Sequence, residues 1–240
     1  MKLNKGPALL TALKNNKLNR DIVIAIPDLH APYHHNDALD FLNDTRKEFK
    51  PTKIVCLGDE ADFHSLSFHD KEPGLYCAGR EYDEAKRFLK NLYKLFPKAQ
   101  CCISNHTARP YRVAHKAGLP SNMILDYRKL FEAPRTWQWA YRIVIDNVVY
   151  EHGDPGSGRN AAYKAMLENR MSTVIGHVHG WAGVQYSKSP FNQTFWMNAG
   201  CLIDPESLAF AYGNKYRNKA TLGCGIIIEG ESAYFVRMPQ

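Results

Sequence analysis

The feature that most constrains the fold of this chain is a repeated alternation of short apolar runs with amphipathic segments. Runs of this kind, each ending in polar residues, are typical of strands that are buried on both faces of a parallel sheet. Between them, residues 37–50 and 81–96 have apolar side chains at helical spacing, and a proline follows each segment. The alternation predicts an α/β fold with parallel strands. The three predicted strands are residues 21–30, 53–60 and 99–106.

In the second half of the chain, strands predominate. Residues 141–154 predict a hairpin that turns at Asp146-Asn147, and residues 159–170 predict a helix. No repeat, low-complexity tract or linker divides the chain. We therefore expect one domain over residues 21–240, with two sheets packed face to face, and a basic helix or arm over residues 1–20. The further predicted strands are residues 172–180, 181–187, 193–198, 222–229 and 233–238.

The composition excludes several classes of protein. Hydrophobic residues make up 45% of the 240 residues, which is enough for a sizeable core and excludes disorder as the dominant state. No stretch approaches the ~18 uninterrupted apolar residues of a membrane span. The six cysteines form no CxxC pair and the N-terminus lacks a signal-peptide core, which favours reduced thiols in a cytoplasmic protein. An exported protein with disulfides is the alternative.

Side chains that bind metal ions follow most of the predicted strands. In open α/β sheets, ligand sites lie beyond the carboxyl ends of the strands, so we expect these groups to converge in space. Carboxylate, imidazole and amide groups together form a mixed set of oxygen and nitrogen ligands, which suits Mn²⁺, Fe or Zn²⁺. Such a set is unlike a thiolate site or an all-oxygen calcium site. The set is too large for one ion and suits two. Its members are Asp28, His30, Asp59, Asn105, His106, His152, His177 and His179.

The order of these motifs carries a resemblance to a known family. The segments D-x-H, G-D-x-x-D, N-H, H-G and G-H-x-H follow one another over residues 21–205, and together they resemble the calcineurin-like metallophosphoesterase superfamily. The resemblance implies a four-layer α/β/β/α sandwich of two mixed sheets. It also implies two divalent metal ions, with Mn²⁺ preferred and Fe or Zn²⁺ as alternatives. One ion would be held by Asp28, His30, Asp59 and His179, and the other by Asp59, Asn105, His152 and His177.

The resemblance also implies a catalytic role for His106. In the family, the matching histidine is not a metal ligand but contacts the scissile phosphate and helps the leaving group depart. One departure from the family pattern adjoins this residue. Ser104 and Thr107 stand where the family has a glycine and an acidic residue, and that acid usually orients the histidine. Asp62 and Asp154 are both candidates to replace it.

The positive charge of the chain is concentrated in two stretches that contain no acidic residue. The net charge is +7, with +5 in residues 1–20 and +8 in residues 85–125, which leaves −6 elsewhere. The second stretch surrounds the N-H motif. We expect the lysines of residues 86–98 to form a solvated helix face. Arg109 and Arg112, which follow the motif, are predicted to bind phosphates of the substrate.

Two further features allow more than one interpretation. The glycine-rich loop at 153–158 precedes a predicted helix, and it is equally consistent with a phosphate cradle and with a plain loop. Trp137, Trp139, Trp181 and Trp196 are expected in the core or in the walls of a groove rather than as platforms for stacked bases.

The functional hypothesis is hydrolysis of phosphodiester bonds in nucleic acid or nucleotides by water that two metal ions activate. The expected partner is a phosphate-ester substrate, with no membrane involved, and the oligomeric state is left open. A phosphomonoesterase acting on proteins or nucleotides is the first alternative. A catalytically inactive binding scaffold is the second. It is disfavoured because the motifs retain every metal-binding and catalytic side chain.

Overall fold

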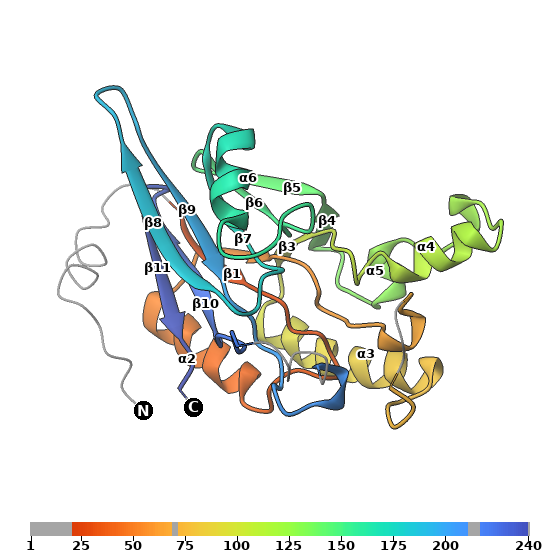
Figure 1. Cartoon of the computed structure of the whole chain (residues 1–240). Coiled ribbons are helices and arrows are strands. Elements are labelled where there is room, and N and C mark those ends of the chain that lie inside the picture. The colour runs from red at the N-terminus through yellow and green to blue at the C-terminus, as the bar shows by residue number, and fades with distance from the viewer. Residues whose placement is uncertain (1–20, 69–71, 211–216, 240) are drawn as a thin grey trace.

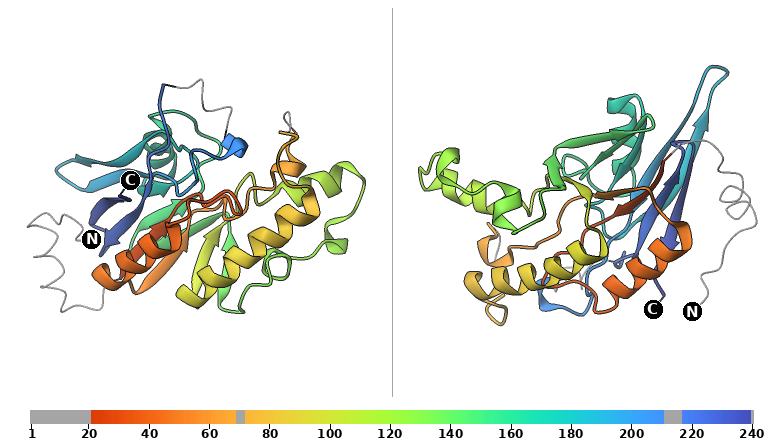
Figure 2. Two further views of the ribbon diagram at one scale, coloured as in Figure 1. Left: turned by 90° about the horizontal axis from the view of Figure 1, so that it is seen from below. Right: turned by 180° about the vertical axis from the view of Figure 1, so that it is seen from behind.

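The computed structural model describes residues 21–68, 72–210 and 217–239. The basic segment 1–20, with its predicted helix, lies outside the described residues. Two β-sheets lie at the centre (Figures 1 and 2). Helices α2 (Ala38–Phe49) and α3 (Ala78–Leu95) lie on one side of them, and α6 (Ala161–Asn169) lies on the other. These three helices begin and end within a few residues of their predicted limits.

The first sheet is mixed and contains the three strands predicted from the N-terminal half of the chain. Strands β1 to β4 are parallel neighbours, and β10 and β11 continue the sheet beyond β1 in antiparallel pairing. The sequence analysis did not predict β4, which is only four residues long. In spatial order the strands are β11 (Ser232–Arg237), β10 (Gly223–Ile228), β1 (Ile22–Ile26), β2 (Lys53–Cys56), β3 (Ala99–Cys102) and β4 (Trp137–Ala140).

The second sheet is also mixed. Strands β6, β7 and β9 are parallel, and β5 and β8 are antiparallel strands at its two edges. The predicted hairpin is β5–β6, and Asp146 and Asn147 turn it with φ values of 49° and 60°. Two successive residues with positive φ match the twist of a two-residue hairpin. In spatial order the strands are β5 (Arg142–Ile145), β6 (Val148–Glu151), β7 (Ser172–Ile175), β9 (Gln193–Ala199) and β8 (Ala182–Lys188).

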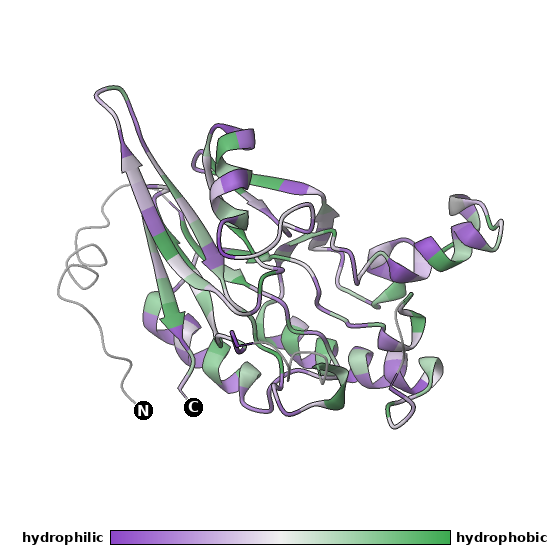
Figure 3. Ribbon diagram, in the orientation of Figure 1, coloured by the Kyte–Doolittle hydropathy of each residue, from purple (hydrophilic) through white to green (hydrophobic). Residues whose placement is uncertain are grey.

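Three separate hydrophobic clusters show that the elements form four layers. In the first cluster, Phe41 and Leu89 of the helices pack with Ile24 of the first sheet. The second cluster lies between the sheets, and the third packs α6 against the second sheet. Figure 3 shows the helices banded by hydrophobic and hydrophilic residues, as expected for helices with one buried face. The four-layer α/β/β/α sandwich is confirmed.

Several short elements connect these layers on the side of α3. They are the 3₁₀ turns η1 (His64–Leu66) and η2 (Ser121–Met123) and the helices α4 (Arg109–Lys116) and α5 (Tyr127–Leu130). The sequence analysis did not predict α4, which is eight residues long and has no buried residue. All six cysteines are free thiols, and five of them are buried. Among the described helices, none has the length and apolarity that crossing a membrane would require.

We expect Phe195→Ala to lower the free energy of unfolding by about 3–5 kcal/mol, because deleting a buried ring leaves a cavity. Phe195 is 2% exposed and lies in the cluster between the sheets. Urea unfolding followed by circular dichroism measures the effect. Leu167→Ala, at a side chain of α6 that is 52% exposed, is the control. It should change the free energy by less than about 0.5 kcal/mol. Equal losses in the two variants would contradict this placement of the core.

Candidate metal centre

The residues that follow the parallel strands of both sheets meet at one place. Strands β1, β2 and β3 of the first sheet and β6 and β7 of the second have their carboxyl ends there. Three groups of side chains each bring their ligand atoms within 4.8 Å of one another. The structure therefore brings together the groups that the sequence predicted to converge. They are Asp28 with His30 and His179, His30 with Asp59 and His106, and Asp59 with His152 and His177.

Asp59 lies at the centre of this arrangement. Its carboxylate is buried, and Oδ2 lies 3.3 Å from Nε2 of His30 and 3.3 Å from Nε2 of His152. Oδ1 accepts the backbone N–H of His106 at 3.2 Å. The N–H of Asp59 itself donates to Ser104 Oγ at 2.9 Å. One carboxylate thus faces imidazoles that follow strands of both sheets.

The hydrogen bonds of His152 direct its Nε2 at several acceptor atoms. Nδ1 donates to the carbonyl oxygen of Leu57 at 2.9 Å, so Nδ1 carries a proton. Nε2 lies 2.7 Å from Oδ1 of Asn105, 3.2 Å from Nδ1 of His177 and 3.3 Å from Oδ2 of Asp59. A single proton on Nε2 can satisfy only one of these acceptors. A cation among them would satisfy all of them.

His30 has the same arrangement. Its Nδ1 lies 2.5 Å from Oδ1 of Asp62, which orients the ring and fixes the proton on Nδ1. Its Nε2 is buried and faces Asp59, and no hydrogen-bond partner for it exists among the described residues. The ring of His179 lies beside that of His30, with 5.0 Å between centroids. A carboxylate behind a histidine whose other nitrogen is free is typical of metal ligation.

Close backbone approaches hold these groups in place. His30, Asp59 and His177 have φ values of 51°, 49° and 63°, a region that costs a non-glycine residue on the order of 1–3 kcal/mol. Asp28 accepts the backbone N–H of His177 at 2.8 Å. A Cβ atom at Gly176 would lie 2.5 Å from Oδ2 of Asp28, so this approach requires glycine.

Of the two carboxylates that the sequence left as candidates to orient His106, the structure brings Asp62 to it. Oδ1 of Asp62 lies 2.8 Å from Nδ1 of His106 and 2.5 Å from Nδ1 of His30. The carbonyl oxygen of Asp62 also lies 2.9 Å from Nδ1 of His106. One aspartate therefore contacts both a candidate metal ligand and the candidate catalytic histidine.

The residues that depart from the family pattern form a buried network behind the site. The hydroxyl of Ser104, which accepts the N–H of Asp59, donates to Thr107 Oγ1 at 2.7 Å. Thr107 donates to Oε2 of Glu60 at 3.0 Å, and Nε1 of Trp139 donates to Oε1 of Glu60 at 2.7 Å. Sequence reasoning missed Glu60, although its place next to Asp59 in the sequence was a signal. Ser104 acts here as a support for the central carboxylate.

The structure places the two predicted substrate-binding arginines differently. Arg109 is largely buried. Its Nη2 lies 3.1 Å from Nε2 of His106, and its Nη1 donates to the carbonyl oxygen of Asp62 at 2.8 Å. Arg112 is exposed, and its guanidinium lies 4.7 Å from the centre of the Phe68 ring. Arg109 therefore belongs to the cluster and Arg112 does not. Substrate binding by either stays a prediction.

The acid-free positive stretch is partly neutralised by acidic residues that flank it. Lys86 and Lys90 of α3 pair with Glu132 at 3.2 Å and 3.0 Å, and Arg87 pairs with Glu84 at 2.7 Å. These cations lie on a helix of the outer layer, away from the ligand cluster. From this stretch, Arg109 is therefore the cationic residue that lies at the ligand cluster.

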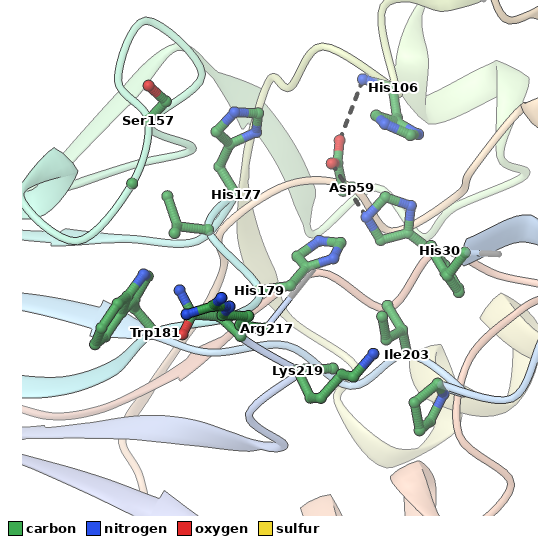
Figure 4. Close-up of a pocket in the computed structure, with 17 residues that line it drawn as sticks. His30, Asp59, His106, Ser157, His177, His179, Trp181, Ile203, Arg217 and Lys219 are labelled. Atoms are coloured by element: carbon green, nitrogen blue, oxygen red, sulfur yellow. Dashed lines mark hydrogen bonds and ion pairs between the residues drawn. The ribbon is translucent and has the colours of Figure 1, made fainter. Parts of the chain in front are cut away.

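A cavity of about 610 Å³ adjoins the ligand cluster (Figure 4). Part of its lining is the cluster itself, and part comes from a wall that the sequence did not predict as a site. Trp181, Arg217 and Lys219 belong to that wall. Trp181 lies two residues after the G-H-x-H motif, which was a signal for it. No sequence pattern marked residues 217–219. From the glycine-rich loop, Ser157 and Gly158 reach the cavity.

Burial and neighbouring carboxylates decide which side chains hold protons. Burial lowers the pKa of His30, but Asp59 and Asp62 outweigh it and raise that pKa to about 10. Asp59 likewise raises the pKa of His152 to about 9 against the effect of burial. Burial lowers the pKa of His177 to about 4. At neutral pH, His30 and His152 are therefore protonated on both ring nitrogens and positively charged, whereas His177 is neutral.

Comparisons with known proteins found similar structures but no similar sequence. No model of a known protein family matches the chain, and no curated protein sequence matches it significantly. Solved structures similar to it include Vacuolar Protein Sorting 29 from Cryptosporidium parvum, with 12% identity, a TM-score of 0.46 and coverage of 87% of this chain and 85% of that one. For Vps29 from Chaetomium thermophilum these values are 11%, 0.40, 85% and 82%. For nuclease MPE from Pseudomonas putida they are 12%, 0.34, 88% and 85%. We therefore argue function from the side chains of this chain.

We expect Mn²⁺ added to the metal-free protein to release protons, because His30 and His152 must lose theirs before binding a cation. Their pKa values are raised to about 10 and about 9, so affinity should rise from about pH 6 to about pH 8 as the competing protons are lost. Calorimetry in buffers of different ionisation enthalpy measures the protons released. Binding without proton release, or an affinity that falls as the pH rises, would contradict this arrangement.

Proposed function

We propose that this chain is a divalent-metal-dependent phosphoesterase that hydrolyses phosphodiester bonds of nucleic acid or nucleotides. The observation that carries the proposal is the meeting of acceptor atoms around Asp59. Its Oδ2, Oδ1 of Asn105 and Nε2 of His152 converge, and Nε2 of His30 faces the same carboxylate. Such a buried set is costly unless a positive charge lies among its members. The set opens directly into a cavity that can admit a substrate.

The donor atoms suit Mn²⁺ and other transition-metal ions. Imidazole nitrogens with carboxylate and amide oxygens form a mixed set, and all six thiols lie outside it. Two groups that share Asp59 favour two ions, and we take Mn²⁺ as the first choice, with Fe or Zn²⁺ as alternatives. The first ion would be held by Asp28, His30, Asp59 and His179, and the second by Asp59, Asn105, His152 and His177.

Within this proposal, His106 acts on the leaving group. Bound divalent ions would neutralise phosphate oxygens and lower the pKa of an attacking water. Asp62 holds the proton on Nδ1 of His106, which directs Nε2 to the opposite side of the ring. Arg109 donates to that Nε2, and it would turn to a phosphate oxygen when substrate enters. With Arg109 turned away, Nε2 can take up a proton from solvent water, and His106 then gives that proton to the departing oxygen.

The cavity supports a diester more than a monoester. It continues beyond the ligand cluster to Trp181 and Arg217, and a second ester group would occupy that space. The partner is then a phosphate-ester substrate. We also propose a cytoplasmic location, with which six free thiols are compatible.

We expect Mn²⁺-dependent hydrolysis of bis-p-nitrophenyl phosphate that a chelator abolishes and added Mn²⁺ restores. For a diester with an alkoxide leaving group, such as thymidylyl-(3′→5′)-thymidine, His106→Ala should lower kcat by a factor on the order of 10²–10⁴, because that leaving group then departs without a proton donor. The metal content of this variant, measured by mass spectrometry, should equal that of the unaltered protein. His115→Ala, at an exposed histidine of α4, is the matched control and should leave kcat unchanged.

Each of three outcomes would contradict a different part of the proposal. Hydrolysis of nucleoside monophosphates without any action on diesters would replace it by a phosphomonoesterase. Stoichiometric metal binding without hydrolysis of either class would replace it by a binding scaffold. Unchanged kcat in His106→Ala would remove this histidine from the mechanism.

A further inference from the structure

The cavity has a second wall that the chemistry at the metal centre does not use. Figure 4 shows His106 and Asp59 on one side, and Trp181 and Arg217 on the other. Three apolar residues, Ile203, Pro205 and Phe210, also line the cavity. A molecule whose phosphate lies at the ligand cluster could therefore extend within the cavity towards an indole ring and two cations.

This second wall is fixed to the ligand loop by backbone contacts. The N–H of Thr221 donates to the carbonyl oxygen of His179 at 2.8 Å. A Cβ atom at Gly180 would lie 3.0 Å from Cβ of Asn218, so the two segments run in close contact. Arg217 and Lys219 are thereby held beside the loop that carries a candidate ligand.

The indole ring of Trp181 is also held in place. The guanidinium of Arg159 lies 5.3 Å from the ring centre, a distance at which a cation is attracted to the face of an aromatic ring. Trp181 is partly exposed and lines the cavity. A partly exposed aromatic ring at the wall of a cavity can stack with a planar group of a ligand.

The charge of the cavity favours an anionic ligand beyond the scissile phosphate. Arg217 and Lys219 line it, and Asp59 is the only carboxylate among its described lining residues. Asp59 is directed at the ligand cluster and not at the second wall. A second negatively charged group of the ligand would therefore meet the guanidinium of Arg217, and among the described lining residues no carboxylate lies on that wall.

We propose, on the basis of the proposed function, that the substrate is a small nucleotide diester. Its base stacks on Trp181, and a second phosphate on the same nucleoside is bound by Arg217, with Lys219 beside it. The cavity volume of about 610 Å³ is in the range of sites for small molecules, roughly 300–1,000 Å³. In a duplex the bases are stacked on one another, so a duplex would leave the second wall unused. This assignment reverses the expectation that Trp181 is only a groove wall.

The test uses three diesters that share the p-nitrophenolate leaving group. Methyl p-nitrophenyl phosphate has no base, thymidine 5′-(p-nitrophenyl phosphate) adds the base, and its 3′-phosphorylated form adds a second phosphate. In the unaltered protein, kcat/KM should rise at each step, by roughly ten- to hundred-fold for the base if it stacks on an aromatic ring. Ratios between substrates cancel any loss of folded protein or metal.

Two variants separate the two contacts. Trp181→Ala should remove the gain from the base, and Trp181→Phe should keep most of it. Arg217→Gln should remove the gain from the 3′-phosphate and leave the gain from the base. Phe191→Ala and Arg237→Gln, at an exposed aromatic residue and an exposed arginine, are the matched controls and should keep both ratios.

A binding measurement distinguishes failure of this inference from failure of the proposed function. Calorimetry with thymidine 3′,5′-bisphosphate and the Mn²⁺-loaded protein needs no turnover, and Trp181→Ala should raise its Kd by roughly ten-fold or more. Binding with this dependence but no hydrolysis would overturn the phosphoesterase and leave the nucleotide site. Equal kcat/KM for all three diesters, or a preference for duplex DNA, would overturn the nucleotide site and leave the phosphoesterase.

Discussion

The arrangement of the ligand cluster depends on the buried carboxylate of Asp59, which faces several ring nitrogens. Asp59 cannot be stable in the interior beside Asn105 and the imidazoles of both sheets unless protons or a cation lie between them. The four-layer fold supplies the geometry, because it brings the carboxyl ends of parallel strands from two sheets to one place. The raised pKa values of His30 and His152 and the clustering of candidate metal ligands both follow from that convergence.

The surroundings of Asp59 are built to hold it, at a cost to the local backbone. His30, Asp59 and His177 keep left-handed backbone conformations that side chains other than glycine rarely adopt. Ser104 binds the backbone of Asp59 where the related pattern has a glycine, and Asp62 serves both His30 and His106. These contacts determine orientation rather than stability.

The sequence predicts the central strands and the convergence of the ligands well, for physical reasons. A strand covered on both faces is a continuous apolar run, as in Ile22–Ile26, and ligands at strand ends share one edge of the sheet. Other features depend on long-range contacts that no local pattern records. The second wall exists only because residues 217–221 pack beside His179 and Gly180. The ion pairs of Lys86 and Lys90 with Glu132 were not predicted for the same reason, since Glu132 lies outside their stretch.

Each sheet supplies only part of the ligand cluster. Asp28, His30 and Asp59 follow strands of the first sheet, and His152 and His177 follow strands of the second. A cation held by both sets would cross-link the two sheets, in addition to the apolar cluster and the hydrogen bonds that already join them. Its binding would add to the stability of the folded chain, by about 2.7 kcal/mol when the free ion is at about 100 times its Kd. The supply of the metal ion would then affect the stability of the folded protein as well as its chemistry.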